Sequence, residues 1–377
     1  MANQNEFPTA LALDPICGQP RQAARVATLR SPRALADAGL IASDRVPLLE
    51  TVAERYTVAV PATLAALIDP AHAEDPIALQ VIPDPRELVT RPEERLDPIG
   101  DEAFSPVRGV THRYPDRVLL RPLLSCPLYC RFCFRREVVG RAAGSLTPAE
   151  LDAAVDYIAS TPAIREVILT GGDPLLLSAR RLRDLLERLA AVPHVESLRI
   201  HTRVPIATPD TVSAALLRAL RPAKPVWLAV HVNHVRELGD AACAALGRLA
   251  DSGIPLLGQT VLLRGVNDQS TTLADLFRRL VALRVKPYYL HHPDLAPGTA
   301  HFRVSLAEGR ALYAALRGHL PGHAIPTYVL DIPGGAGKVP VEAPWVEAEP
   351  DGGWRILDRK GERHRYETWL QTSLGEE

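Results

Sequence analysis

RVLLRPLLSCPLYCRFCFRRE, residues 117–137, places three of the chain's five cysteines within eight residues, directly after a short apolar run. The spacing is C-x3-C-x2-C, over Cys126, Cys130 and Cys133. In parallel α/β folds, chemistry gathers at the carboxyl ends of strands, and this loop follows such an end. Three thiolates at this spacing predict an iron–sulfur cluster with one iron left open. Two alternatives to such a cluster are a zinc site completed by a distant cysteine and a set of redox-active thiols.

Six short apolar runs, rich in β-branched residues, alternate with amphipathic segments after residue 105. They predict strands at residues 117–124, 166–170, 197–203, 226–232, 256–263 and 287–292. Thr147, Ser178 and Ser305 have the sequence context of helix N-caps, so helices are expected to begin after them. Alternating strands and helices indicate a parallel sheet in an α/β protein. Six units predict a partial (β/α)6 barrel rather than a closed eight-stranded one.

Length and composition define the class of protein. A chain of 377 residues can bury a sizeable core without disulfides, and its net charge of -1 gives no basic field for nucleic acid. The start lacks a signal-like segment and no apolar run approaches a membrane span, which predicts a cytoplasmic protein. We expect a mainly helical N-terminal region over residues 1–105, a barrel over 106–330 and a short C-terminal extension over 331–377.

The cysteine loop resembles that of the radical S-adenosylmethionine superfamily. Gly171, Gly172 and Asp173 follow the second predicted strand, where the superfamily places a glycine-rich contact to the methionine moiety. Further motifs narrow the resemblance: GVTHRYPDRVLL (109–120), RIHTRVPI, HVNH, TVLLRGVND (260–268), PYYLHHPDL and PGGAGKVP (333–340). In this order and spacing the chain resembles the lysine 2,3-aminomutases. The resemblance implies a 4Fe–4S cluster, S-adenosylmethionine and pyridoxal phosphate, and an isomerase that converts L-lysine to β-lysine.

Lys338 is the residue that the resemblance assigns to pyridoxal phosphate. The chain has only four lysines, and Lys338 is the one that follows a glycine-rich turn, where the backbone can approach a ligand closely. Arg113, Tyr114 and Arg117 match the positions that contact the cofactor phosphate in the family. For Arg113 a solvated basic turn stays open as the alternative.

Substrate recognition is expected to depend on three charged residues. By resemblance Arg135 binds the substrate carboxylate, and Asp294 with Asp331 binds the distal ammonium of lysine. Each of these acids, taken alone, also fits an ordinary loop residue. His231 and Gln259, at the ends of the fourth and fifth predicted strands, match family positions near S-adenosylmethionine.

Several residues depart from the family pattern. No cysteine follows Cys243, and Gln269 stands where a zinc-ligand cysteine is expected, so a zinc-linked tetramer is not expected and a homodimer stays open. Phe132 replaces a histidine in the loop, and His291 replaces a tyrosine near the cofactor phosphate. The loop sequence is similar to the shorter branch that makes (R)-β-lysine for elongation factor P, which is the first alternative function.

Two further alternatives are an aminomutase for another amino acid, arginine or glutamate, and a noncatalytic iron–sulfur or zinc module. The acidic pair disfavours glutamate, because a third carboxylate would be repelled. A binding module has no need for Lys338, Arg135 and both aspartates together. As a small-molecule enzyme of this kind, the protein would also require a low-potential electron donor such as flavodoxin or ferredoxin.

Overall fold

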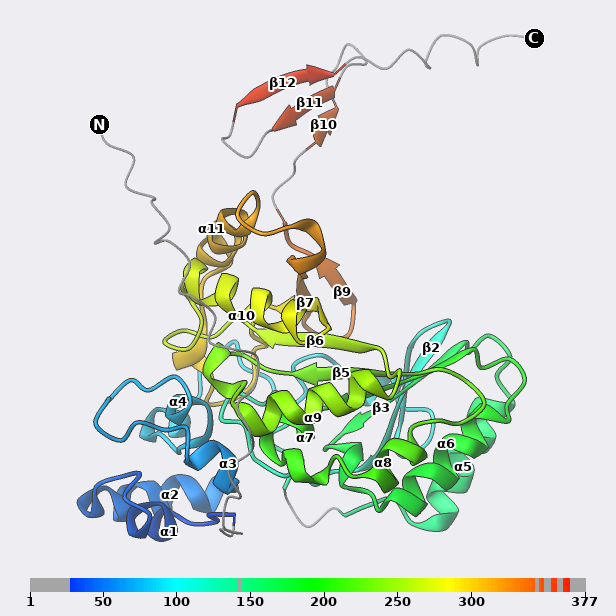
Figure 1. The fold of residues 1–377 in the computed structure, drawn as a ribbon, viewed down its shortest axis with the longest axis horizontal. Coiled ribbons are helices and arrows are strands. Elements are labelled where there is room, and N and C mark those ends of the chain that lie inside the picture. The colour runs from blue at the N-terminus through cyan, green and yellow to red at the C-terminus, as the bar shows by residue number, and fades with distance from the viewer. Residues whose placement is uncertain (1–27, 141–143, 343–345, 349–353, 358–361, 367–377) are drawn as a thin grey trace.

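The computed structural model describes residues 28–140, 144–342, 346–348, 354–357 and 362–366. A nine-stranded mixed sheet forms a nearly closed barrel with helices on its outer face (Figure 1). The strands lie in the sheet in chain order: β1 (Val110–Tyr114), β2 (Arg117–Leu123), β3 (Glu166–Gly171), β4 (Ser197–Thr202), β5 (Val226–His231), β6 (Leu256–Val261), β7 (Val285–His291), β8 (Thr327–Ile332) and β9 (Gly337–Pro340).

Strands β2 to β8 are parallel, and β1 and β9 pair antiparallel at the two edges. The chain returns between successive parallel strands through six helices: α5 (Pro148–Ala159), α6 (Ala179–Ala190), α8 (Ala214–Ala219), α9 (Asp240–Asp251), α10 (Ser270–Ala282) and α11 (Leu306–Leu316), with the short α7 (Val204–Ala207) before α8. All six predicted strands are present, so the prediction of a partial (β/α)6 barrel is confirmed. The sequence pattern does not predict β1, β8 or β9.

The predicted helix starts are present because their caps satisfy the first backbone N–H groups. The Thr147 hydroxyl accepts from the Glu150 N–H at 3.3 Å, and the Glu150 carboxylate accepts from the Thr147 N–H at 2.8 Å. Ser305 and Glu308 form the same reciprocal cap on α11, and the Ser178 hydroxyl accepts from the Arg181 N–H to cap α6. In α6 the leucines that recur at helical spacing are buried against the sheet: Leu182, Leu185, Leu186 and Leu189.

The N-terminal region packs directly on the barrel. Its helices are α1 (Pro32–Asp37), α2 (Val46–Arg55), α3 (Ala62–Ala65) and α4 (Ala78–Val81), drawn in blue in Figure 1. Leu35, Leu49 and Leu64 belong to the same buried cluster as the barrel strands. The predicted boundary at residue 105 therefore crosses a shared core, and the division into three units stays a prediction.

The C-terminal part contributes to two sheets. β8 crosses the predicted boundary at residues 330 and 331, and β9 completes the barrel sheet. A separate antiparallel sheet follows, with β10 (Val346–Ala348), β11 (Trp354–Leu357) and β12 (Arg363–Tyr366), and it stands apart from the barrel in Figure 1. Residues 1–27 and 367–377 of the predicted terminal segments lie outside the described residues. Across the described ranges, no helix has the length and apolar character that a membrane crossing needs.

The two glycines after β3 allow the cysteine loop to approach the strand end. Gly171 has a φ of +101°, and a Cβ on Gly172 would lie 2.2 Å from the Ser125 carbonyl oxygen. The Gly172 N–H donates to the Leu123 carbonyl at 2.8 Å, and the Asp173 N–H donates to the Ser125 carbonyl at 2.9 Å. The close approach that glycine permits here is to the chain's own cysteine loop.

Replacing Gly172 by alanine is expected to displace the loop or strain it, because the added methyl group meets the backbone of Leu124 and Ser125. We expect a loss of about 1–3 kcal/mol in the free energy of unfolding, measured by chemical denaturation. Gly247→Ala in α9 is the matched control, since a Cβ there meets nothing within 4 Å. That control should gain roughly 0.5–1 kcal/mol. Equal effects of the two substitutions would contradict the account.

Candidate active site

The carboxyl ends of the parallel strands open into a cavity of about 680 Å³, within the range of about 300–1,000 Å³ for ligand pockets. It is lined by the predicted site residues Arg113, Tyr114, Arg117, Cys126, Cys130, Cys133, Arg135, Gly172, Asp173, His231, Gln259, Asp294, Asp331 and Lys338. Gly171, the remaining predicted residue, directly precedes Gly172 and is not among the lining residues. Residues more than 200 positions apart in the sequence thus meet in one cavity.

The three loop cysteines are free thiols on the wall of this cavity. Within the described ranges, no three His, Cys, Asp or Glu side chains are grouped to hold a single metal ion. A cubane does not require such a grouping, because each of its thiolate ligands binds a different iron. Cys243, a candidate for a fourth zinc ligand, lies buried in α9 with its thiol 3.2 Å from the Leu238 carbonyl, and it does not line the cavity.

Burial makes this loop a poor place for free thiolates. It raises the pKa of Cys126, and burial together with the neighbouring Cys130 raises the pKa of Cys133 to about 11. Iron bound to sulfur reverses that preference, because a coordinated thiol is deprotonated by the metal. The donor set therefore fits a cluster bound by three thiolates.

A buried ion-pair triad fixes the cysteine loop to the N-terminal region. The Arg131 Nε donates a hydrogen bond to the Glu87 Oε1 at 2.9 Å, and its Nη1 donates to the Thr57 carbonyl at 2.9 Å. Arg136 also pairs with Glu87 and donates to the Arg131 carbonyl at 2.8 Å. The Glu87 side chain is fully buried, and those of the two arginines are 2% and 4% exposed. The triad gives Arg136 a structural role.

Asp173 ties the ends of β3 and β4 together. Its carboxylate accepts from the Thr202 hydroxyl at 2.8 Å, the Arg203 N–H at 2.7 Å and the Leu175 N–H at 3.1 Å. Burial raises the pKa of Asp173 to about 6, and these donors act against that rise. The carboxylate is engaged with the protein itself, although the residue lines the cavity.

His231 and Gln259 are register partners at the ends of β5 and β6. The His231 Nε2 lies 3.1 Å from the Asn233 Oδ1, and burial lowers the pKa of His231 to about 3. His201, on β4, also faces the cavity, and its Nε2 is buried without a hydrogen-bond partner. The pKa of His201 lies well below its usual range, mainly because the side chain is buried and secondly because of the nearby charge of Arg199. Both imidazoles are therefore neutral at neutral pH.

Lys338 lies on β9, directly opposite Asp331 on β8. Its ammonium pairs with the Asp331 carboxylate and lies 3.3 Å from the His291 Nδ1, while its backbone N–H donates to the Tyr114 hydroxyl at 2.8 Å. Burial, and then the charge of Lys338, holds the pKa of His291 well below its usual range. His291 is therefore a neutral acceptor beside the lysine.

Asp294 completes an acidic pair with Asp331 in the same cavity. The pKa of Asp294 is raised to about 7, mainly because the carboxyl is buried and secondly because of the negative charge of Asp331. Near neutral pH the Asp294 carboxyl is therefore partly protonated, and a bound cation would favour its ionised form.

Two of the predicted arginines share one partner that sequence reasoning missed. Asp101, which is buried, accepts from Arg113 Nη2 at 3.0 Å and from Arg135 Nη2 at 2.7 Å. Burial raises the pKa of Asp101, but the charge of Arg135 and its hydrogen bond outweigh that and hold it below its usual value. The Arg113 side chain is only 10% exposed, which argues against a solvated turn. Arg117 stacks on the Tyr114 ring at 3.9 Å.

Residues 121–277 match a family model described as the radical SAM superfamily, and residues 313–351 match one described as lysine-2,3-aminomutase. The barrel, the three-cysteine loop and the first of these matches define the chain as a radical S-adenosylmethionine enzyme.

Curated relatives identify the family within that class. An L-lysine 2,3-aminomutase from Clostridium subterminale is 43% identical over 281 residues, 74% of this chain and 68% of the relative. A putative L-lysine 2,3-aminomutase from Aquifex aeolicus is 39% identical over 322 residues, 85% of this chain and 83% of the relative. A glutamate 2,3-aminomutase from Clostridioides difficile is 36% identical over 293 residues, 78% of this chain and 69% of the relative.

The chain therefore belongs to the lysine 2,3-aminomutase family. It is an isomerase of a family whose cofactors are a 4Fe–4S cluster, S-adenosylmethionine and pyridoxal phosphate. The three thiols, and Lys338 with arginine and tyrosine side chains in the same cavity, fit these cofactors.

Replacing Glu87 by glutamine should leave two buried guanidinium groups without their shared carboxylate. We expect a loss of about 3–5 kcal/mol in the free energy of unfolding, measured by chemical denaturation. Asp251→Asn is the matched control, because Asp251 pairs with Arg284 at 2.7 Å on the surface. The control should cost at most about 1 kcal/mol. A Glu87→Gln protein as stable as the control would show that the triad does not fix the loop.

Proposed function

We propose that this protein moves the amino group of L-lysine from carbon 2 to carbon 3 and releases β-lysine. The acidic pair Asp294 and Asp331 is the observation that carries the proposal. It lies in the same cavity as Arg135, so a carboxylate and an ammonium on one substrate have partners of opposite charge. Asp331 already pairs with a primary ammonium, that of Lys338. The curated relatives named L-lysine 2,3-aminomutase support the same substrate.

The cysteine end of the cavity would hold the cluster and S-adenosylmethionine. Cys126, Cys130 and Cys133 would bind three irons, and the open iron would bind S-adenosylmethionine. His231, Gln259, Gly172 and Asp173 line the same cavity as the thiols and, together with Gly171, would contact that cofactor. When bound, the cluster and S-adenosylmethionine supply a group that abstracts hydrogen, and pyridoxal phosphate holds the migrating amino group.

The opposite end would hold pyridoxal phosphate and the substrate. Lys338 would bind the cofactor, and Arg113, Tyr114 and Arg117 would bind its phosphate. Arg135 would bind the substrate carboxylate, and its hydrogen bond to Asp101 fixes the direction of the guanidinium. The cofactors supply the chemistry, so the protein acts by holding the reacting groups close together and excluding water.

Three other substrates are compared with L-lysine: glutamate, arginine and the other enantiomer of lysine. Glutamate would place a second carboxylate beside Asp294 and Asp331, which repel it, although one relative carries the name glutamate 2,3-aminomutase. Arginine has a distal cation that the acidic pair would also attract. A preference for the other lysine enantiomer would point to the branch that serves elongation factor P.

The proposal also includes an electron donor, a cellular location and an oligomeric state. A low-potential donor such as flavodoxin or ferredoxin would supply the electron that the cluster needs. The protein would act in the cytoplasm, where thiols stay reduced. A homodimer is the assembly we propose, because no cysteine follows Cys243 to bind zinc at a subunit interface.

Anaerobic reconstitution with iron, sulfide and pyridoxal phosphate tests the proposal. The holoenzyme is incubated with S-adenosylmethionine, dithionite and, separately, L-lysine, D-lysine, L-arginine or L-glutamate, and products are identified by mass spectrometry. We expect β-lysine from L-lysine. A protein with a full cluster that yields β-lysine from neither enantiomer would overturn the proposal.

Replacing Lys338 by alanine should abolish the visible absorbance of lysine-bound pyridoxal phosphate and reduce turnover to background. Lys286→Ala is the control, because Lys286 is exposed and donates to the Pro287 carbonyl at 2.7 Å, away from the cavity. The control should keep the absorbance of the unmodified protein. If the Lys338→Ala protein keeps it as well, the cofactor is bound elsewhere.

The KM for L-lysine should depend on pH through Asp294. A group with a pKa of about 7 goes from mostly protonated to mostly ionised between about pH 6 and pH 8. Only the ionised form attracts the substrate ammonium, so KM should fall by up to about tenfold over this range as pH rises. Asp294→Asn should raise KM and remove this part of the pH dependence. A variant with the same pH profile as the unmodified enzyme would exclude Asp294 as its source.

A further inference from the structure

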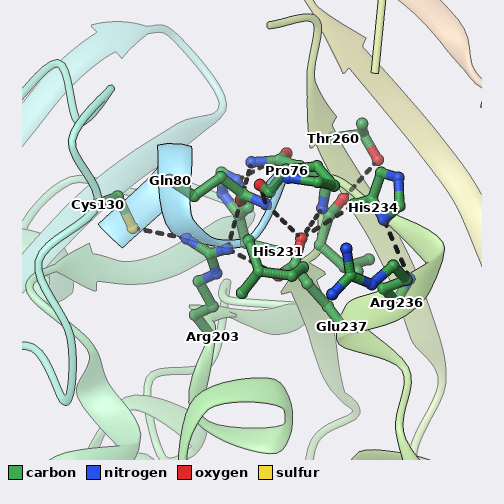
Figure 2. Close-up of polar contacts among 12 residues, drawn as sticks. Pro76, Gln80, Cys130, Arg203, His231, His234, Arg236, Glu237 and Thr260 are labelled. Atoms are coloured by element: carbon green, nitrogen blue, oxygen red, sulfur yellow. Dashed lines mark hydrogen bonds and ion pairs between the residues drawn. The ribbon is translucent and has the colours of Figure 1, made fainter. Parts of the chain in front are cut away.

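Arg203, directly after β4, joins the cysteine loop to a buried polar network (Figure 2). Its Nη1 donates to the Cys130 sulfur at 2.8 Å, while its Nη2 donates to the Glu237 Oε2 and the Gln80 Oε1, each at 2.7 Å. Its side chain is 6% exposed, and that of Glu237 is fully buried. One guanidinium therefore spans a thiol on one side and a carboxylate on the other.

The partners of Arg203 are themselves fixed. Glu237 accepts from the Asn233 and His234 N–H groups at 2.9 Å each, and from the Gln80 side chain at 3.1 Å. Gln80, on α4, also accepts from the Asn233 side chain at 3.0 Å. Because every polar neighbour is engaged, the guanidinium has one orientation, with a donor aimed at the sulfur.

Phe132 covers the guanidinium from within the cysteine loop, with its ring centroid 5.6 Å from the Arg203 Cζ. The ring also contacts His231, at a centroid distance of 5.6 Å. This apolar cover keeps solvent from screening the charge beside the sulfur. Phe132 thus has a physical role at the position where a histidine was expected.

We propose that Arg203 is a positioning residue that raises the reduction potential of the cluster by hydrogen bonding to the Cys130 sulfur. One electron from an external donor makes the cluster more negative, and a charge-assisted donor to a ligating sulfur stabilises that state more than the oxidised one. Glu237 sets the size of the effect, since it orients the guanidinium and compensates part of its charge. The inference rests on the cluster ligands named in the proposed function.

The test is a redox titration of the reconstituted holoenzyme with dithionite, followed by electron paramagnetic resonance of the reduced cluster. Iron and sulfide per chain are measured for every sample. The variants are Arg203→Gln, Arg203→Lys and Glu237→Gln. Arg199→Gln is the matched control, because Arg199, on β4, pairs with Glu166 at 2.8 Å and donates to the Tyr288 hydroxyl at 3.2 Å rather than to a cysteine sulfur.

The variants should shift the midpoint potential in opposite directions. Arg203→Gln should lower it, and Arg203→Lys should lower it less, because the charge remains while the fork is lost. Glu237→Gln should raise it, because the compensating charge is gone while the Gln80 Oε1 still accepts from the Arg203 Nη2 and holds the guanidinium. The control should leave it unchanged. A merely structural role for Arg203 would not produce shifts of opposite sign.

An Arg203→Gln protein with full iron content and an unchanged midpoint overturns the inference. If that variant loses its cluster, Glu237→Gln decides, and an unchanged or lower midpoint overturns the inference equally. An unmodified protein that binds no cluster would instead overturn the proposed function, so the two failures are distinguishable.

Discussion

The buried pairing of Glu87 with Arg131 and Arg136 is the interaction on which the site depends. A loop that presents three thiols to a cavity has no regular backbone pairing of its own, so it must be held from outside. The N-terminal region does this through the triad and through the carbonyls of Ala59 and Gln80, which accept from backbone N–H groups of the loop at 3.2 and 2.9 Å. The N-terminal region, predicted from the sequence only as mainly helical, therefore supports the cysteine loop.

The sheet provides the second constraint, because it brings the C-terminal lysine back to the cavity. After β8 the chain turns and pairs antiparallel with it as β9, which sets Lys338 opposite Asp331. The same sheet carries the cysteine loop at the end of β2, near its other edge. Because the barrel is nearly closed, β9 lies next to β1, where the Lys338 N–H donates to the Tyr114 hydroxyl at 2.8 Å, so the two distant sheet positions line one cavity.

Sequence patterns predicted the strands and helices whose signal is local. Leucine spacing and the Thr147, Ser178 and Ser305 caps identified helices, but β9 has only 4 residues and is defined by its pairing with β8 rather than by its own pattern. The ligand contact predicted for the glycines at the end of β3 stays a prediction, and Gly172 is in addition required by the close approach of the Ser125 carbonyl. Asp101 and Glu87 were missed because only the fold brings them to their arginines.

The central claim is that the thiol end and the lysine end of the cavity act on one substrate. The most direct test follows deuterium from carbon 3 of L-lysine through turnover of the reconstituted holoenzyme. The account predicts deuterium at carbon 2 of β-lysine and in 5′-deoxyadenosine, the molecule that the 5′-deoxyadenosyl group of S-adenosylmethionine becomes when it takes a hydrogen. Formation of unlabelled 5′-deoxyadenosine during turnover of the labelled substrate would contradict it, because the abstracting group would then not reach the lysine held by Asp294 and Asp331.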